Sequence, residues 1–182
     1  MNPSSVMMMG GLSALCAGSV GIMFLVAGFA KLREHDLFLG TLSSYRLLPA
    51  ASLEGVAWAL AFAEVMTGAM LLSGFGLAVG SVLAALMLLL FAGAMGVNVA
   101  RGRTDLSCGC TPGQKGETLS WSLVFRTLAC VVPALLPAIV GRSSSWVLQV
   151  EGVMCGVACW MLWLAFRSLL QAQTVASTGA EA

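Results

Sequence analysis

The sequence predicts an all-α bundle of transmembrane helices, and two properties of the chain support this. First, 59% of its 182 residues are hydrophobic and 9% are charged, whereas a soluble domain has about 25% charged residues. Second, its apolar residues form long continuous runs, which are typical of spanning helices and unlike the short alternating strands of a barrel. Because lipid offers no hydrogen bonds to the backbone, these runs are expected to be helical.

Charged residues divide the chain into five apolar segments, each close to the roughly 20 residues that cross a bilayer. The segments that we expect to be helical are Met7–Ala30, Leu53–Ser73, Leu77–Ala100, Leu119–Val140 and Trp146–Phe166. No basic region or cleavage signature accompanies the first, so we expect a membrane span there and not a cleaved signal peptide. We therefore expect one transmembrane domain over residues 1–170, followed by a disordered polar tail over 171–182.

The segment Lys31–Ala51 between the first two spans has a different pattern. Apolar residues alternate there with charged ones, and Pro49 follows. This pattern predicts an amphipathic segment that lies at the membrane surface and stops at the proline. Its simplest interpretation is a connector without a catalytic role.

The chemically distinctive motif is Cys108-Gly109-Cys110, in the polar loop Arg101–Thr118. A thiolate is the nucleophile of disulfide exchange, and nearby cations such as Arg101 and Arg103 favour the thiolate form. Gly109 can adopt the unusual backbone angles that a small disulfide ring would require. The motif therefore predicts a redox-active pair at a membrane face.

A second interpretation of the same pair is a ligand set for a soft metal ion in a membrane carrier. A third is a structural membrane subunit in which the thiols have no role. We expect no zinc site, because the chain lacks the paired ligand motifs that zinc requires. The cysteines inside spans are interpreted as small apolar fillers, and these are Cys16, Cys130, Cys155 and Cys159. His35, which stands beside acids, is interpreted as a solvated interfacial residue.

Two charges inside spans need partners, because an intramembrane charge normally faces the bundle interior. At about 1.5 Å per helical residue, Arg126 lies roughly 10 Å and Glu64 about 16 Å from the cysteine side. Lys31 and Asn98 lie towards the same side. We expect Glu64 and Arg126 to form a buried ion pair that fixes helix packing. The alternative is a polar cleft for proton transfer or thiolate stabilisation beneath the loop.

The orientation of the loop is indicated differently by charge and by chemistry. Most cations fall on the cysteine side, namely Lys31, Arg33, Arg46, Arg101, Arg103, Lys115 and Arg167, and Arg142 falls on the other. The positive-inside rule would place the cysteines in the cytoplasm. Persistent disulfide chemistry is typical of the extracytoplasmic side. We give the chemistry more weight, and expect the loop to be extracytoplasmic.

Several stretches of the chain resemble a known family. The stretch GFAKLREHDLFLGTLSSYRLLP, which ends at Pro49, is similar to the segment after the first span of the MauE methylamine-utilisation proteins. NVARGRTDLSCGC, Asn98–Cys110, resembles the segment after their third span. Glu64, Gly68 and the Leu71-Leu72 pair match the pattern of their second span. The family is also similar to DoxX-type four-helix membrane proteins.

The resemblance implies a multi-pass protein of the bacterial inner membrane with a four-helix DoxX-like core, to which the fifth span is added. It implies support for maturation of the exported, disulfide-rich β subunit of methylamine dehydrogenase, or of another exported protein. The implied partner is a thioredoxin-like periplasmic protein of the MauD type, with Cys108 and Cys110 as the redox pair. A quinone would suit a membrane oxidant, but no residue pattern identifies its site. The net charge of +1 gives no support for nucleic-acid binding.

Overall fold

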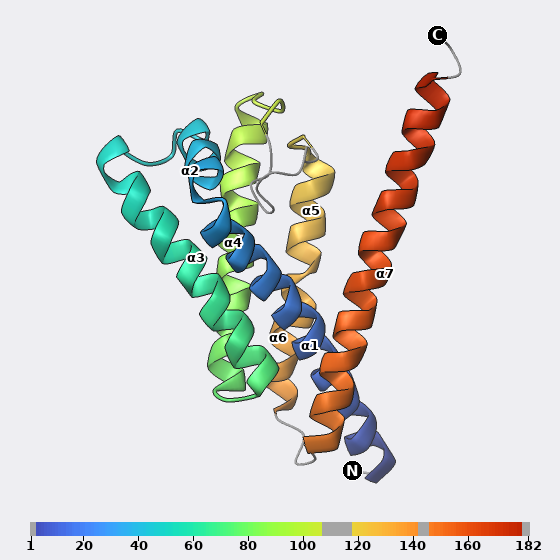
Figure 1. Ribbon diagram of the computed structural model, residues 1–182. Coiled ribbons are helices and arrows are strands. Elements are labelled where there is room, and N and C mark those ends of the chain that lie inside the picture. Colours follow the sequence, from blue (N-terminus) through green and yellow to red (C-terminus); the bar gives the residue numbers. More distant parts are fainter. Residues whose placement is uncertain (1–2, 107–117, 142–145, 180–182) are drawn as a thin grey trace.

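The computed structural model describes residues 3–106, 118–141 and 146–179, and it confirms an all-helical membrane protein (Figure 1). Four helical segments of the described chain are long and apolar enough to cross a membrane: Met8–Arg33, Ala50–Ser73, Leu77–Ala100 and Trp121–Val140. The helices in chain order are α1 (Pro3–Arg33), α2 (His35–Ser44), α3 (Ala50–Ser73), α4 (Leu77–Ala100), α5 (Trp121–Ala129), α6 (Val131–Val140) and α7 (Trp146–Gly179).

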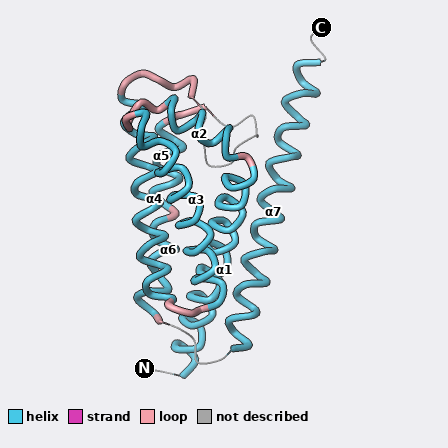
Figure 2. The backbone as a smooth tube through the Cα atoms, turned by 60° about the vertical axis from the view of Figure 1, so that its left-hand side comes forward, coloured by secondary structure: helices cyan, strands magenta, loops and turns pink. Residues whose placement is uncertain are grey.

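Helix α1 runs through the bundle and packs against α3, α6 and α7, while α4 packs against α3, α5 and α6 (Figures 1 and 2). The short helix α2 and the ends of the α4–α5 connection lie at one end of the bundle. The N-terminus and the α3–α4 turn lie at the opposite end. This arrangement agrees with the expected sidedness, since the segment Lys31–Ala51 and the loop after α4 share one end.

The fourth expected span consists of two helices, α5 and α6, which meet at Cys130. Pro133 explains the break, because its ring has no N–H to donate to the carbonyl of Ala129 and would clash with that carbonyl in a continuous helix. The start of α5 is fixed by an N-cap residue. The side chain of Ser120 accepts a hydrogen bond from the backbone N–H of Leu123 at 3.3 Å, which satisfies one of the unpaired donors of the first turn.

Small residues let α1 approach α3 closely. A Cβ atom at Gly68 would lie 2.8 Å from the carbonyl oxygen of Gly21 and 2.8 Å from the backbone nitrogen of Leu25. A Cβ atom at Gly28 would lie 2.9 Å from the backbone nitrogen of Val65. Close backbone contact of this kind is how transmembrane helices gain packing energy without a hydrophobic driving force.

Helix α7 packs against α1 in the same way. Gly152 faces the backbone of Ala14, and Gly156 faces the backbone of Gly18 and Ser19, with no space for a Cβ atom at either glycine. Gly152 and Gly156 form a G-x-x-x-G pattern, which is common at close helix crossings in membranes. The crossing lies near the start of α7, and the rest of that helix diverges from the bundle (Figure 2).

The far end of α7 differs from the expected disordered tail. The helix has 34 residues and continues to Gly179, so the expected tail 171–182 is helical as far as the structure describes it. At 1.5 Å per residue its length is about 51 Å, well beyond the thickness of a hydrocarbon layer. Helix α7 therefore continues past the expected end of the fifth span.

We predict that a chain truncated after residue 142 still inserts and folds as a four-span unit. Two clusters of buried apolar residues in the described chain are built from α1, α3, α4, α5, α6 and adjacent connecting residues. Truncation exposes Gly18 to lipid but removes no member of either cluster. Membrane accumulation and the unfolding midpoint in detergent would test this. Loss of the truncated protein from membranes, while the full chain accumulates, would show that α7 is essential for the fold.

Candidate functional site

The most buried polar contact in the described part of the bundle joins Lys31 of α1 to Glu64 of α3. The ammonium Nζ lies 2.8 Å from Oε1 and 2.7 Å from Oε2 of the carboxylate. Each residue is 1% exposed. Gly28, one turn before Lys31, permits this contact, because a Cβ atom there would lie 3.0 Å from the Cβ atom of Glu64. The pair is an intramembrane ion pair with both carboxylate oxygens engaged.

The expected partner of Glu64 was wrong. The prediction paired it with Arg126, but the structure pairs it with Lys31, and Arg126 lies exposed on α5. The depths of the residues were sufficient to place all three in the same half of the bundle. They could not indicate which face of each helix points inwards, and Lys31 was interpreted as the boundary of the first span.

Aromatic rings enclose the ammonium group of Lys31. The ring centre of Phe38 on α2 lies 5.3 Å from Nζ, and that of Phe91 on α4 lies 5.4 Å away. Both distances fall within the range of cation–π attraction. Phe38 is itself buried, so α2 covers the ion pair from the end of the bundle. The interfacial helix is therefore part of the packed structure and more than a surface connector.

A second polar cluster lies at the end of α4, where the residues A-R-G-R terminate the helix. Gly102 has a φ of 74°, and its N–H donates to the carbonyl of Val99 at 2.9 Å. The N–H of Arg103 donates to the carbonyl of Asn98 at 3.0 Å. These two bonds make a Schellman motif, which requires the left-handed conformation that glycine adopts without strain.

This motif turns the side chain of Arg103 towards α2. Its Nη2 donates to the carbonyl of Ser44 at 2.7 Å, and Nη1 donates to the carbonyl of Tyr45 at 3.4 Å. Nη1 also donates to Oδ1 of Asn98 at 3.2 Å. The buried Asn98 amide in turn donates to the carbonyl of Ala94 at 3.0 Å. A cation beside the last carbonyls of a helix is favourable, because the partial negative charge of the helix lies there.

The Cys-Gly-Cys motif follows directly after this cluster. Cys108 and Cys110 lie outside the described residues, as does Lys115, so the structure does not test their predicted roles. What it describes is the two ends of their loop, where the N–H of Leu119 donates to the carbonyl of Leu106 at 3.1 Å. Of the two predicted loop cations, Arg101 is exposed at the end of α4, while Arg103 is half-buried against α2.

A third cluster, which the sequence did not indicate, joins the start of α2 to α3. The His35 ring stacks on Trp58 with centroids 4.2 Å apart. Its Nε2 lies 3.1 Å from Oε1 of Glu54, which also accepts from Nε1 of Trp58 at 3.1 Å. The His35 side chain is 13% exposed, so its interpretation as a solvated residue was wrong. The i, i+4 spacing of Glu54 and Trp58 could have suggested their hydrogen bond.

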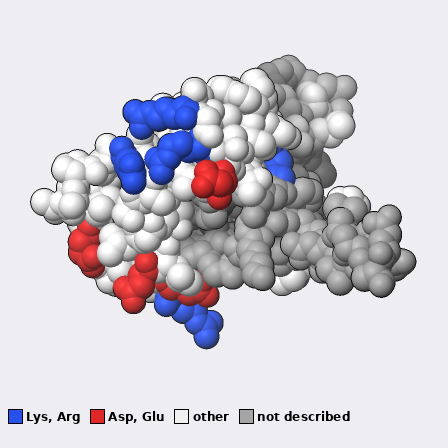
Figure 3. Space-filling model, turned by 90° about the horizontal axis from the view of Figure 1, so that it is seen from above, with Lys and Arg blue, Asp and Glu red and all other residues white. Residues whose placement is uncertain are grey.

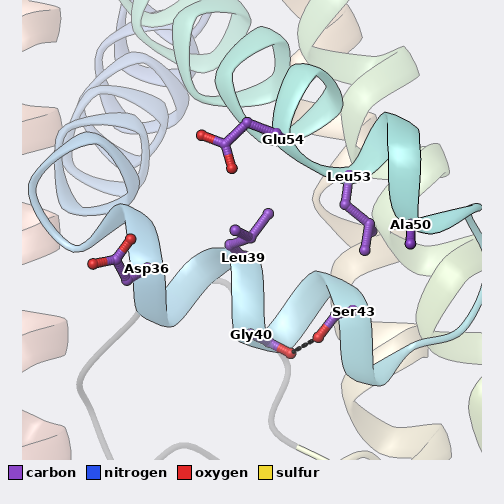
Figure 4. A pocket seen from close by; sticks show the side chains of 7 residues that line it. All are labelled: Asp36, Leu39, Gly40, Ser43, Ala50, Leu53 and Glu54. Carbon is purple, nitrogen blue, oxygen red and sulfur yellow. Dashed lines mark hydrogen bonds between the residues drawn. The ribbon is translucent and has the colours of Figure 1, made fainter.

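Beside this cluster, α2 and α3 border an open groove of about 400 Å³ (Figure 4). The carboxylates of Asp36 and Glu54 lie along it, and Leu39 and Leu53 provide its apolar surface. Viewed from this end, basic side chains gather over one part of the surface, while most acidic side chains lie near another edge (Figure 3). The loop end of the molecule is therefore electrostatically uneven.

The cysteines within the spans were interpreted as small apolar fillers, and their burial differs from one to the next. Cys16 is buried, Cys130 is partly buried, and Cys155 and Cys159 are exposed on α7, and all four are free thiols. Cys155 and Cys159 lie one turn apart on α7. Within the described ranges, no cluster of three or more histidine, cysteine or acidic side chains could hold a metal ion.

Comparison with known proteins agrees with the resemblance found in the sequence. The family model described as methylamine utilisation protein MauE matches residues 9–140, which covers most of α1 and all of α2 through α6. The chain is 32% identical over 164 residues to the methylamine utilization protein MauE of Paracoccus denitrificans, a match covering 87% of each chain. The protein of that name from Paracoccus versutus is 32% identical over 148 residues, covering 79% of this chain and 78% of the relative.

A shorter match joins the chain to the methylamine utilization protein MauE of Methylophilus methylotrophus, 36% identical over 91 residues and covering 50% of this chain and 48% of the relative. No solved structure matches the chain significantly. The residues matched by the family model include all three clusters described above and the loop that follows α4. The chain therefore belongs to the MauE family of methylamine utilisation proteins.

Proposed function

We propose that this protein is an inner-membrane maturation factor whose Cys108 and Cys110 exchange disulfides with a thioredoxin-like protein on the extracytoplasmic face. The exported β subunit of methylamine dehydrogenase, or a similar disulfide-containing protein, is the substrate that this system serves. The observation that carries the proposal is the position of the thiol pair. It lies between two membrane spans, in a loop whose described ends are joined by the Leu119–Leu106 hydrogen bond.

The exchange follows from thiol chemistry. The thiolate of one loop cysteine attacks a sulfur of the partner's disulfide, that S–S bond breaks, and a mixed disulfide forms while the partner's second sulfur leaves as a thiolate. The other loop cysteine then attacks the mixed disulfide. The partner is released as a dithiol, and the pair in the loop becomes a disulfide. The reverse sequence uses the same bonds, so the relative reduction potentials of the two pairs set the direction.

The extracytoplasmic location agrees with the redox conditions that such chemistry needs. The excess of lysine and arginine at this end of the bundle would instead indicate a cytoplasmic location, but part of that excess is explained by packing. Lys31 neutralises Glu64 inside the bundle, and Arg103 binds the carbonyls at the end of α2. Neither cation is simply a solvated loop charge, so a count of all lysines and arginines overstates the positive-inside signal for this end.

Trapping of the mixed disulfide tests the proposal. We expect either Cys108→Ser or Cys110→Ser to accumulate a covalent, reductant-sensitive adduct with a thioredoxin-fold partner, because the remaining attacking thiol has no second thiol to resolve it. The other substitution should abolish the adduct. Cys155→Ser and Cys159→Ser are matched controls and should behave like the unmodified protein. Adducts would be separated by non-reducing electrophoresis and identified by mass spectrometry.

Two results would contradict the proposal. If neither loop variant traps a partner and both lose a stoichiometric bound soft metal, the protein is a metal carrier and the pair is a ligand set. If a membrane-impermeant maleimide fails to label the reduced loop thiols in whole cells but labels them in inverted vesicles, the pair faces the cytoplasm.

A further inference from the structure

We propose that Arg103 is a positioning residue that fastens the end of α2 to the root of the Cys-Gly-Cys loop, and that it supports exchange through geometry and not through its charge on the thiols. The inference rests on the proposed function. It assigns Arg103 a role different from that of Arg101, although both cations precede the same motif.

The first support is the orientation of the guanidinium group. Its fork donates to the carbonyls of Ser44 and Tyr45 and to the amide oxygen of Asn98. A guanidinium matches several acceptors at once because its donors are fixed in one plane, whereas a lysine ammonium is a point charge on a flexible stem. The bonds of this fork are directed at α2 and α4, so they hold the two helix ends together.

The second support is the way α2 ends. Tyr45 is followed by Arg46, whose φ is 50°, in a left-handed conformation that is unfavourable for a residue with a Cβ atom. Such a conformation persists where the surroundings over-determine it. A helix of 10 residues has little stability on its own. The bonds from Arg103 to the carbonyls on either side of this helix end supply the constraint.

The third support is the position of Arg103 along the chain. It is the last residue of the Schellman motif of α4, and it precedes Leu106, whose carbonyl accepts a hydrogen bond from the N–H of Leu119 at the described base of the loop. Thus one residue connects helix α2, which covers the ion pair, with the end of α4 and the start of the loop. Arg101 lies in the same stretch but is exposed.

The test compares Arg103→Lys, Arg103→Gln and Arg101→Gln in the full chain, reconstituted in lipid nanodiscs. Two quantities are measured: amide hydrogen exchange of residues 35–44, and the rate of mixed-disulfide formation with a thioredoxin-fold protein carrying an oxidised pair. We expect both Arg103 variants to speed α2 exchange roughly tenfold or more, as loss of a charge-assisted hydrogen bond implies. Both should slow mixed-disulfide formation. Arg101→Gln, which changes an exposed cation at the same helix end, should leave α2 exchange unchanged.

Other outcomes overturn the inference. If Arg103→Lys keeps the normal reaction rate while Arg103→Gln loses it, the charge is what matters. Unchanged exchange in α2, or faster exchange with an unchanged reaction rate, shows that the helix end is not coupled to the chemistry. If the unmodified protein forms no mixed disulfide, the proposed function fails and with it the role in exchange. The amide measurement still decides whether Arg103 holds α2.

Discussion

Replacing Glu64 with glutamine is expected to destabilise the protein by about 3–5 kcal/mol, because the change leaves the ammonium of Lys31 buried without its counter-ion. Both residues are 1% exposed, so water cannot replace the lost partner without opening the bundle. Lys31→Met should have an effect of similar size by orphaning the carboxylate. Reversible unfolding in mixed micelles would measure both.

The double variant distinguishes an ion pair from two independent packing sites. Lys31→Met combined with Glu64→Gln removes both charges, so we expect its destabilisation to be clearly smaller than the sum of the single effects. Arg126→Gln is the control, because Arg126 is exposed on α5 and Glu64 pairs with Lys31 instead, so its effect should be clearly smaller than that of Lys31→Met. Additive single effects, or an Arg126 effect as large as that of Lys31, would contradict the observed pairing.

The spans were predictable because the length of an apolar run must match the thickness of the bilayer that it crosses. The bounds expected for α4 agree with those observed, since polar residues or glycines flank an uninterrupted apolar run. The break between α5 and α6 was harder to predict from the sequence. Pro133 stood within the expected span, but whether a proline kinks or ends a helix depends on its neighbours in three dimensions.

The partners of polar residues were harder to predict, because depth along a helix leaves its rotation undetermined. Glu64 was correctly expected to need a cation, yet the choice between Lys31 and Arg126 depended on which helices touch. Gly28, one turn before Lys31, was a usable signal, since a glycine inside a span often marks a close helix contact. Packing of His35 against Trp58 had no comparable signal, because it joins residues on two different helices.

The Arg-Gly-Arg block shows how one pattern can support two interpretations. It was interpreted as a source of positive charge beside the thiols. The same residues also fit a helix end, with glycine in the left-handed position after α4. The structure shows the second interpretation for Gly102 and Arg103. The thiol motif itself was evident from sequence alone, and its chemistry stays a prediction for the experiments above.

Gly68→Leu is expected to have the second large effect, a destabilisation of about 3 kcal/mol from overpacking. Its Cβ atom would lie 2.8 Å from the carbonyl oxygen of Gly21 and 2.8 Å from the backbone nitrogen of Leu25. Backbone atoms of a helix cannot rotate away as a flexible side chain can, so α1 and α3 must separate. Glu64 lies one turn earlier on α3, and separation would therefore also lengthen its contact with Lys31.

Gly55→Leu is the matched control, because it makes the same change on the same helix, where no heavy atom lies within 4 Å of an added Cβ. Glycine is about 1 kcal/mol less favourable than alanine within a helix, so this control should be neutral or slightly stabilising. Unfolding in mixed micelles would give both values, and cross-linking between cysteines introduced in α1 and α3 would report their separation. Equal effects of the two substitutions would show that helix propensity, and not the close crossing of α1 and α3, governs the response. If the close crossing governs the response, the two changes in the free energy of unfolding should differ in sign or by several kcal/mol. The reason is that lipid can accommodate a leucine at residue 55, but the backbone of α1 cannot accommodate one at residue 68.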